Sequence, residues 1–380
     1  MLFARPTTRA HRRTCYWIWI GLFVIGLQRP TPLTFAIQAV IPVTTADELK
    51  QALQDVQPGQ TIQLADGVYA DEFETTISGT ATQPITLQGS AQAILDRGAI
   101  QGGYGFHLDQ ANYWILSGFT IRNAAKGVML DHASYNILDG LHIDTIGQEA
   151  VHFRTCSSSN ILQHSEIRNT GVITPGYGEG VYIGSDANSW PNYSCDGDGR
   201  DKSHFNQILN NTFGPDVRAE AIDVKEGTIG GKIIGNYFDA TGLSGDNYAD
   251  SWVDIKGNGY AVGHNNGRRG DNSSLYHGFE THAKLAGWGR ENLFYANLAH
   301  VDANGYGFHI DNDDPNHANK ICADNQTFNA ARGMTNISVI GSALASSASS
   351  NISNEASTMT LPRQDATDTV WLPLVFKPAC

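Results

Sequence analysis

The sequence has few of the features that build helical or membrane-bound proteins. Apolar residues rarely recur at the spacing of about 3.6 residues that marks an amphipathic helix. No Cys-x-x-Cys pair is present, which argues against a structural zinc site. Basic residues are also scarce, because 25 Lys and Arg stand against 38 Asp and Glu, for a formal net charge of −13. We therefore expect neither nucleic acid nor an anionic membrane surface as a partner.

The first 39 residues have the layout of a secretory signal peptide. Several arginines precede an apolar run at residues 16–27, and the small residues Ala36 and Ala39 follow. An uncleaved membrane anchor is the alternative, although the run is short for crossing a bilayer. No other segment approaches that length. We predict a signal peptide at residues 1–39 and a secreted or cell-surface protein that needs no other contact with a membrane.

Four cysteines remain after such a signal is removed, and an oxidising compartment favours pairing them. They are Cys156, Cys195, Cys322 and Cys380. Four cysteines allow three pairings, and free buried thiols are the alternative. We favour Cys156–Cys195, which flank an insertion near residues 171–204, and Cys322–Cys380.

The chain carries a short repeated phrase of alternating apolar and polar residues, with a period of roughly 22–30 residues that is typical of stacked coils. The phrase occurs at 105–108, 127–130, 150–153, 180–183, 221–225, 252–256, 278–281 and 307–310. Glycine is abundant, with 40 residues, and asparagine stands where the chain must turn. An antiparallel sandwich would need Asn-Gly hairpin turns at regular spacing, which are missing. The sequence predicts an all-β fold, a right-handed parallel β-helix over residues 43–342.

One helix is expected before the coils, and a polar tail after them. Thr45 and Glu48 form a capping-box pattern, and Pro58-Gly59 ends the segment. Its apolar stripe consists of Leu49, Ala52, Leu53 and Val56. We expect this helix to cap the open end of the stack. Residues 343–380 are rich in Ser, Ala and Thr and form a separate C-terminal tail.

Stacking in register would align equivalent residues of the phrase at about 4.8 Å. The residues expected to point inward are Phe106, Val128, Val151, Val181, Ile222, Val253, Phe279 and Phe308. The outward column is His107, Met129, His152, Tyr182, Asp223, Asp254, Glu280 and His309. Lys225 and Lys256 lie two residues beyond the aspartates. The sequence thus predicts a small patch that contains two carboxylates and two ammonium groups.

Two stacked lysines repel each other, so one of them is expected to be neutral near working pH and able to act as a general base. Asp223 and Asp254 oppose this by favouring the charged forms, and a surface ladder of Asp-Lys pairs is the alternative. Long loops at 185–205, 241–250 and 264–277 are expected to form a groove beside the patch. The residues expected to bind a sugar polymer there are Trp252, Trp288, Arg290, Glu280, His309 and Tyr306.

A third column contains three acids at the strand starts, Glu149, Glu179 and Glu220. Stacked carboxylates repel unless they are protonated or bridged by a cation, and oxygen ligands suit Ca²⁺. The alternative is three solvated acids at turns. We expect a calcium ion as the one possible cofactor, no organic cofactor, and a monomeric protein.

The N-terminal stretch of the domain resembles the start of chondroitinase B and the alginate lyases, which are β-helical polysaccharide lyases. The resemblance lies in Val56-Gln57-Pro58-Gly59, in residues 62–69 and in Gln83-Pro84-Ile85-Thr86-Leu87. It implies a Lys base and an Arg that neutralises the uronate carboxylate on neighbouring coils. Lys225 matches the first position, and Lys256 occupies the second as Lys in place of Arg.

Three functions remain open at this point. The first is a lyase that cleaves an acidic polysaccharide by β-elimination, in which Lys225 removes the C5 proton of a uronate. Lys256, with Ca²⁺ held by the glutamates, would offset the carboxylate charge, and Tyr182 or His282 would protonate the leaving oxygen. The second is a glycoside hydrolase that uses Asp223 and Glu280, about 9.6 Å apart along the axis. The third is a non-catalytic carbohydrate-binding protein.

Overall fold

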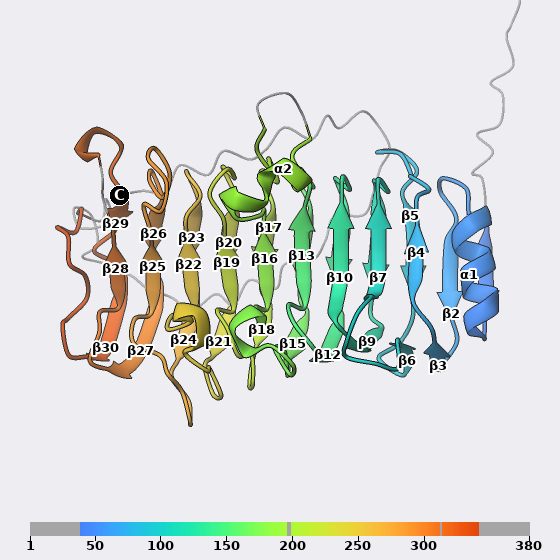
Figure 1. Cartoon of the computed structure of the whole chain (residues 1–380), viewed down its shortest axis with the longest axis horizontal. Coiled ribbons are helices and arrows are strands. Elements are labelled where there is room, and N and C mark those ends of the chain that lie inside the picture. Colours follow the sequence, from blue (N-terminus) through green and yellow to red (C-terminus); the bar gives the residue numbers. More distant parts are fainter. Residues whose placement is uncertain (1–38, 196–198, 312–313, 342–380) are drawn as a thin grey trace, which may run out of the picture. The chain divides into compact units, whose positions relative to one another are not determined.

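Three parallel sheets run the length of the folded domain, and the chain passes through them in turn, coil after coil (Figure 1). The structure is a computed structural model, and it describes residues 39–195, 199–311 and 314–341. Residues 1–38 of the predicted signal peptide, the tail and Cys380 therefore lie outside the described residues. No described helix is long and apolar enough to cross a membrane.

Each sheet is built from one strand per coil. The eleven-stranded sheet contains β1 (Val40–Val43), β2 (Thr61–Leu64), β5 (Ile85–Gln88), β8 (Trp114–Ser117), β11 (Ile137–Asp139), β14 (Ile161–Gln163), β17 (Gln207–Leu209), β20 (Lys232–Ile234), β23 (Ala261–Gly263), β26 (Leu293–Tyr295) and β29 (Lys320–Ile321). The ten-stranded sheet contains β3 (Gly67–Ala70), β6 (Ala93–Asp96), β9 (Thr120–Ala124), β12 (His142–Ile146), β15 (Glu166–Arg168), β18 (Thr212–Phe213), β21 (Tyr237–Asp239), β24 (Asn266–Arg268), β27 (Leu298–Ala303) and β30 (Gln326–Ala330).

The nine-stranded sheet carries the repeated phrase, and its order confirms the predicted stacking. It contains β4 (Phe73–Thr75), β7 (Tyr104–Asp109), β10 (Lys126–Asp131), β13 (Val151–Arg154), β16 (Val181–Ile183), β19 (Ile222–Val224), β22 (Val253–Ile255), β25 (Phe279–Thr281) and β28 (Phe308–Ile310). All eight residues of the predicted inward ladder are fully buried. The outward column from His107 to His309 is also in the predicted register.

Buried asparagines fix the turn that leads, within each coil, from the eleven-stranded sheet to the ten-stranded sheet. The backbone N–H of Asn211 donates to Asn236 Oδ1 at 2.9 Å, and Asn236 donates in the same way to Asn265 at 2.9 Å. Their side-chain amides donate to carbonyls, as Asn236 Nδ2 does to Ile208 at 2.9 Å. The ladder continues through Asn297 and Asn325. Each amide therefore satisfies backbone groups that the turn leaves without sheet partners.

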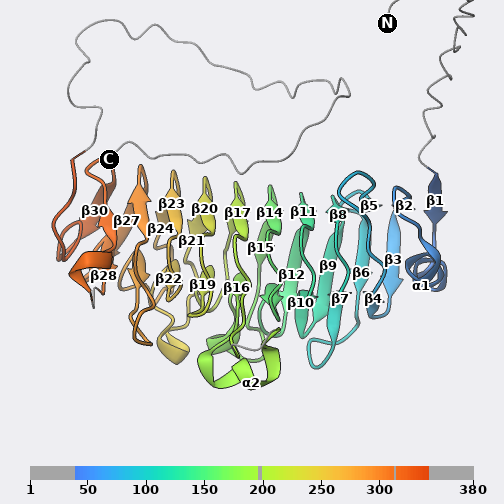
Figure 2. The ribbon, with the colours of Figure 1, turned by 90° about the horizontal axis from the view of Figure 1, so that it is seen from above.

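The predicted helix is α1 (Ala46–Asp55), and it closes the N-terminal end of the stack (Figures 1 and 2). Thr45 and Glu48 form the expected capping box, and the predicted apolar stripe is buried. The other helical segments are short and belong to loops beside the nine-stranded sheet: η1 (Pro175–Tyr177), η2 (Ala187–Ser189), α2 (Trp190–Tyr193), η3 (Asp246–Tyr248) and η4 (Pro315–His317).

Candidate active site

The two lysines meet at one carboxylate on the outer face of the nine-stranded sheet. Strands β16, β19 and β22 stack Tyr182, Asp223 and Asp254 directly above one another. Lys225 Nζ lies 2.6 Å from Asp223 Oδ2, and Lys256 Nζ lies 2.8 Å from Asp223 Oδ1. Lys256 also contacts Asp254 Oδ2 at 2.5 Å. The predicted patch therefore exists, as a chain of alternating charges.

This arrangement corrects the expectation that one lysine is neutral. Burial alone lowers the pKa of an ammonium group, but the charge of Asp223 outweighs that effect. The pKa of both Lys225 and Lys256 is therefore raised above the ordinary value. Both side chains are only 11% exposed. The prediction missed the bridging role of Asp223.

Tyr182 and His282 flank the lysines on either side. Lys225 Nζ lies 4.8 Å from the centre of the Tyr182 ring, a cation–π contact. Burial, reinforced by the charge of Asp223, raises the pKa of Tyr182, so its phenol stays neutral. On the other side, His282 Nδ1 lies 2.7 Å from Asp254 Oδ1. That hydrogen bond raises the pKa of His282 to about 9 despite burial.

The column of glutamates is only partly as predicted. Glu149 accepts hydrogen bonds from Lys126 and from His152, the latter at 2.9 Å. Although burial opposes it, the hydrogen bond from His152 and the charge of Lys126 hold the pKa of Glu149 at about 2. Glu179 and Glu220 instead lie near Asp223, with one oxygen of each residue within 4.8 Å of the others. Glu149 therefore has two hydrogen-bond donors of its own, Lys126 and His152.

Glu179 and Glu220 remain without a basic partner among the described residues. Burial, with the charges of Glu149 and Asp223 added, raises the pKa of Glu179 to about 8. Burial and Asp223 raise the pKa of Glu220 as well. These two carboxyls are the members of the predicted set that can still accept a cation.

Trp252 was wrongly predicted to stack on a sugar, because its side chain points into the core. It is 1% exposed, its Nε1 donates to the carbonyl of Arg268 at 3.0 Å, and its ring packs edge-on against Phe279. The residue begins the repeated phrase, one position before the inward Val253, and its side chain also turns into the core. The alternation of apolar and polar residues does not show whether a side chain at the end of a strand points into the core or toward solvent.

The other predicted binding residues lie on the C-terminal side of the lysines. His309 Nδ1 contacts Glu280 Oε1 at 3.1 Å, and its ring stacks on His277 and Tyr306. Arg290 pairs with Asp314 at 3.2 Å, and the guanidinium of Arg200 lies 5.5 Å from the Trp288 ring.

His277, Glu280 and His309 have metal-ligand chemistry, but one hydrogen bond argues against a metal there. The backbone N–H of Tyr306 donates to His277 Nδ1 at 2.9 Å, which places the ring proton on Nε2. Burial lowers the pKa of His277 to about 4, so the ring stays neutral. The protonated Nε2 faces Glu280 at 3.6 Å and offers no lone pair to a cation.

A cavity that the sequence analysis missed adjoins Tyr182 on the N-terminal side. It has a volume of about 260 Å³, and its walls include Lys126, Arg154, Tyr177 and Tyr193. Tyr177 and Tyr193 belong to two long loops, one before and one after β16. Cys195, which lies in the second loop, and its predicted partner Cys156 were the available signal. Loop residues lie outside the repeated phrase, so the register of the phrase does not predict where their side chains lie.

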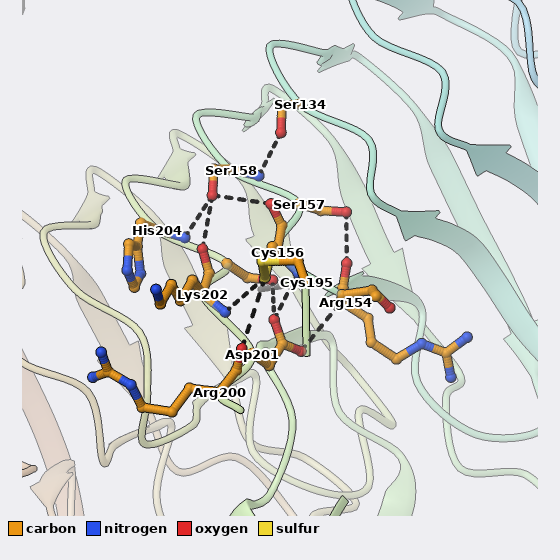
Figure 3. The surroundings of a disulfide bond; sticks show 12 residues. Ser134, Arg154, Cys156, Ser157, Ser158, Cys195, Arg200, Asp201, Lys202 and His204 are labelled. Atoms are coloured by element: carbon orange, nitrogen blue, oxygen red, sulfur yellow. Dashed lines mark hydrogen bonds between the residues drawn. A yellow bond between two sulfur atoms is a disulfide. The ribbon is translucent and has the colours of Figure 1, made fainter. Parts of the chain in front are cut away.

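The predicted Cys156–Cys195 bridge is confirmed, and it anchors the second loop beside the cavity (Figure 3). The fully buried Asp201 carboxylate accepts hydrogen bonds from the backbone N–H groups of Thr155 at 3.1 Å and Cys156 at 2.8 Å. It also accepts one from the hydroxyl of Ser185 at 3.0 Å. The loop is thus fixed to the end of β13 by one covalent bond and one buried carboxylate.

Comparisons with known proteins agree with this fold. Residues 40–180 match the family described as "Pel9A-like, right handed beta helix region", which gives the predicted handedness. A solved alginate lyase from Paenibacillus sp. str. FPU-7 is 38% identical with a TM-score of 0.71, and the match covers 78% of this chain and 97% of that one. No curated protein sequence matches the chain significantly.

Two more distant structures share the fold alone. One is the lacto-N-biosidase of Eubacterium ramulus, 12% identical with a TM-score of 0.55, covering 80% of this chain and 67% of that one. The other is PfbA, a surface adhesin of Streptococcus pneumoniae, 14% identical with a TM-score of 0.51 and 74% of each chain covered. One architecture thus serves a glycosidase and an adhesin, so function has to be argued from the site.

Proposed function

Because the chain belongs to the family of the β-helical Paenibacillus alginate lyase, and so is a polysaccharide lyase, we propose that it cleaves a uronate-containing polysaccharide by β-elimination at Lys225, Lys256 and Tyr182. The observation that carries this proposal is the pair of lysines bonded to opposite oxygens of Asp223 beside Tyr182. Alginate is the first substrate to test, because the 38% identical relative acts on it.

The lysines have different surroundings, which supports different roles. Lys256 contacts two carboxylates, Asp223 and Asp254, and stays charged. We assign it to the uronate carboxylate, whose negative charge grows as the C5 proton leaves. Lys225 pairs with Asp223 alone and is the proposed base, active in its deprotonated fraction. Asp223 and Asp254 position the two ammonium groups.

Tyr182 is the preferred general acid. Its raised pKa keeps the phenol protonated, and its ring contacts Lys225. His282 is the alternative acid, but it lies beyond Asp254 on the far side of the lysines. We propose that Glu280, Trp288, Arg290, Tyr306 and His309 contact the sugars on that far side.

Incubation with alginate should produce an ultraviolet absorbance from unsaturated uronate ends, which β-elimination forms and hydrolysis does not. A neutral polysaccharide should give no signal, because it lacks the carboxylate that acidifies the C5 proton. New reducing ends without the absorbance would show hydrolysis and would overturn the proposed reaction.

We propose Glu179 and Glu220 as the residues able to hold the predicted Ca²⁺, which would add positive charge near the substrate carboxylate. If they do, adding Ca²⁺ to chelated protein should raise the melting temperature, because ligand binding stabilises the folded state. Glu220→Gln should remove that rise, since it removes one carboxylate. If the melting curves with chelator and with Ca²⁺ are identical, Glu179 and Glu220 do not bind Ca²⁺.

We further propose that the protein is exported. The disulfide between Cys156 and Cys195 is typical of oxidising compartments. A polymer substrate also has to be met outside the cell. Detection of the chain in culture medium, with residues 1–39 absent by mass spectrometry, tests this proposal.

A further inference from the structure

The cavity beside Tyr182 is placed where the next sugar of a bound polymer would lie. We propose that it is a binding subsite for a uronate adjacent to the cleaved bond, on the N-terminal side, with Lys126 and Arg154 recognising the sugar's carboxylate. The proposal rests on the proposed function, because Tyr182 belongs to both sites. None of the substrate-binding residues predicted from the sequence lies on this side.

The two cations are held in place but keep donors for a ligand. Lys126 Nζ has three N–H donors, Glu149 accepts one, and the side chain is 22% exposed. Arg154 uses Nε and Nη2 on Asp131, both at 2.7 Å, and a guanidinium has further N–H groups. These ion pairs fix the positions of both side chains before a ligand arrives. A carboxylate in the cavity gains charge-assisted hydrogen bonds with little ordering cost.

Two tyrosines on opposite walls frame the same space. Tyr177 is 54% exposed on η1, and that loop is tied to a neighbour by Asn247 Nδ2, which donates to the Gly176 carbonyl at 3.0 Å. Tyr193 is on α2, and the guanidinium of Arg154 lies 4.2 Å from its ring. The Cys156–Cys195 bridge fixes this second loop (Figure 3). Both aromatic side chains are therefore presented by anchored loops, as a preformed sugar site requires.

The groove continues beyond this cavity along the coils. A second cavity of about 560 Å³ shares Lys126 and Gln148 with the first and extends to Tyr104 and Thr174. The two cavities together extend along four neighbouring strands, β7, β10, β13 and β16. At about 4.8 Å per coil, this gives a length of about 14 Å. Lys126 lies where the cavities meet, so it is the cation best placed to hold a polymer that passes through both.

The test compares binding in a chain that does not turn over its ligand. In the Lys225→Ala background, titration calorimetry with alginate oligosaccharides should give a Kd about tenfold weaker for Lys126→Met. Lys126→Arg should restore most of the affinity, because Arg keeps the charge. In the otherwise native chain, Lys126→Met should raise KM about tenfold while kcat changes less than twofold.

A matched control separates the loss of this cation from the loss of any lysine. Lys50, on the capping helix, also forms an ion pair, with Asp71, and Lys50→Met should leave Kd and KM unchanged. Unchanged Kd and KM in folded Lys126→Met would overturn the subsite. Failure of the Lys225→Ala chain to bind alginate and polygalacturonate would overturn the subsite together with the substrate class. Full activity of Lys225→Ala would overturn only the catalytic assignment, because the KM comparison in the otherwise native chain would still test the subsite.

Discussion

Lys225→Ala should lower kcat on alginate by at least about 10²-fold, the usual contribution of a general base. The side chain ends on the outer face, whereas Ile222 and Val224 of the same coil fill the core. Its removal leaves that core intact, so the melting temperature should fall only modestly. Unsaturated-product formation under saturating substrate, with circular dichroism as the check on folding, measures both quantities.

Two further variants show whether charge or proton transfer is lost. Lys256→Arg should keep partial activity, because Arg still presents a positive charge to a carboxylate. Lys232→Ala, on β20 of the same coil but in another sheet, should behave like the native chain. Native-like turnover by Lys225→Ala would remove Lys225 as the base, and Tyr182 would then be the next residue to test.

The fold was predictable because its determinants repeat. Every coil places an apolar residue at the same point of the phrase, from Phe106 to Phe308, and one register satisfies all of them at once. A slip by one residue would turn the entire ladder outward. The capping helix was predictable for a different reason, since Thr45 and Glu48 form a local motif that needs no distant partner.

The site was predictable only where it lies on the strands. Register alone brought Tyr182, Asp223 and Asp254 together. The register could not show that both lysines pair with one carboxylate, because a long, flexible side chain can reach several different partners from the same backbone position. Nor could it place Tyr193 beside Arg154, since Tyr193 lies on a loop without a repeat.

Asp223→Asn should move the alkaline rise of activity to lower pH, and this is the sharpest test of the proposed base. A base acts when deprotonated, and the pKa of Lys225 is raised, so native activity should increase with pH across the neutral and alkaline range. Among the described residues, Lys225 pairs with no carboxylate except Asp223. Asparagine keeps the shape and removes that charge, while Lys256 stays paired with Asp254. The pKa of Lys225 should therefore fall, and the rise in kcat/KM should shift by at least about one pH unit.

The same substitution separates the lyase from a hydrolase that uses Asp223 as one of its carboxylates. The hydrolase would lose activity at every pH, because its acid or base is gone. The lyase would become relatively more active near neutral pH, at a cost of about 3–5 kcal/mol in stability, because two buried ammonium groups lose their shared partner. Rate profiles of both chains between pH 6 and about 10, each checked for folding by its melting curve, decide the matter. An unshifted profile in folded Asp223→Asn would show that the ionisation of Lys225 does not limit the reaction.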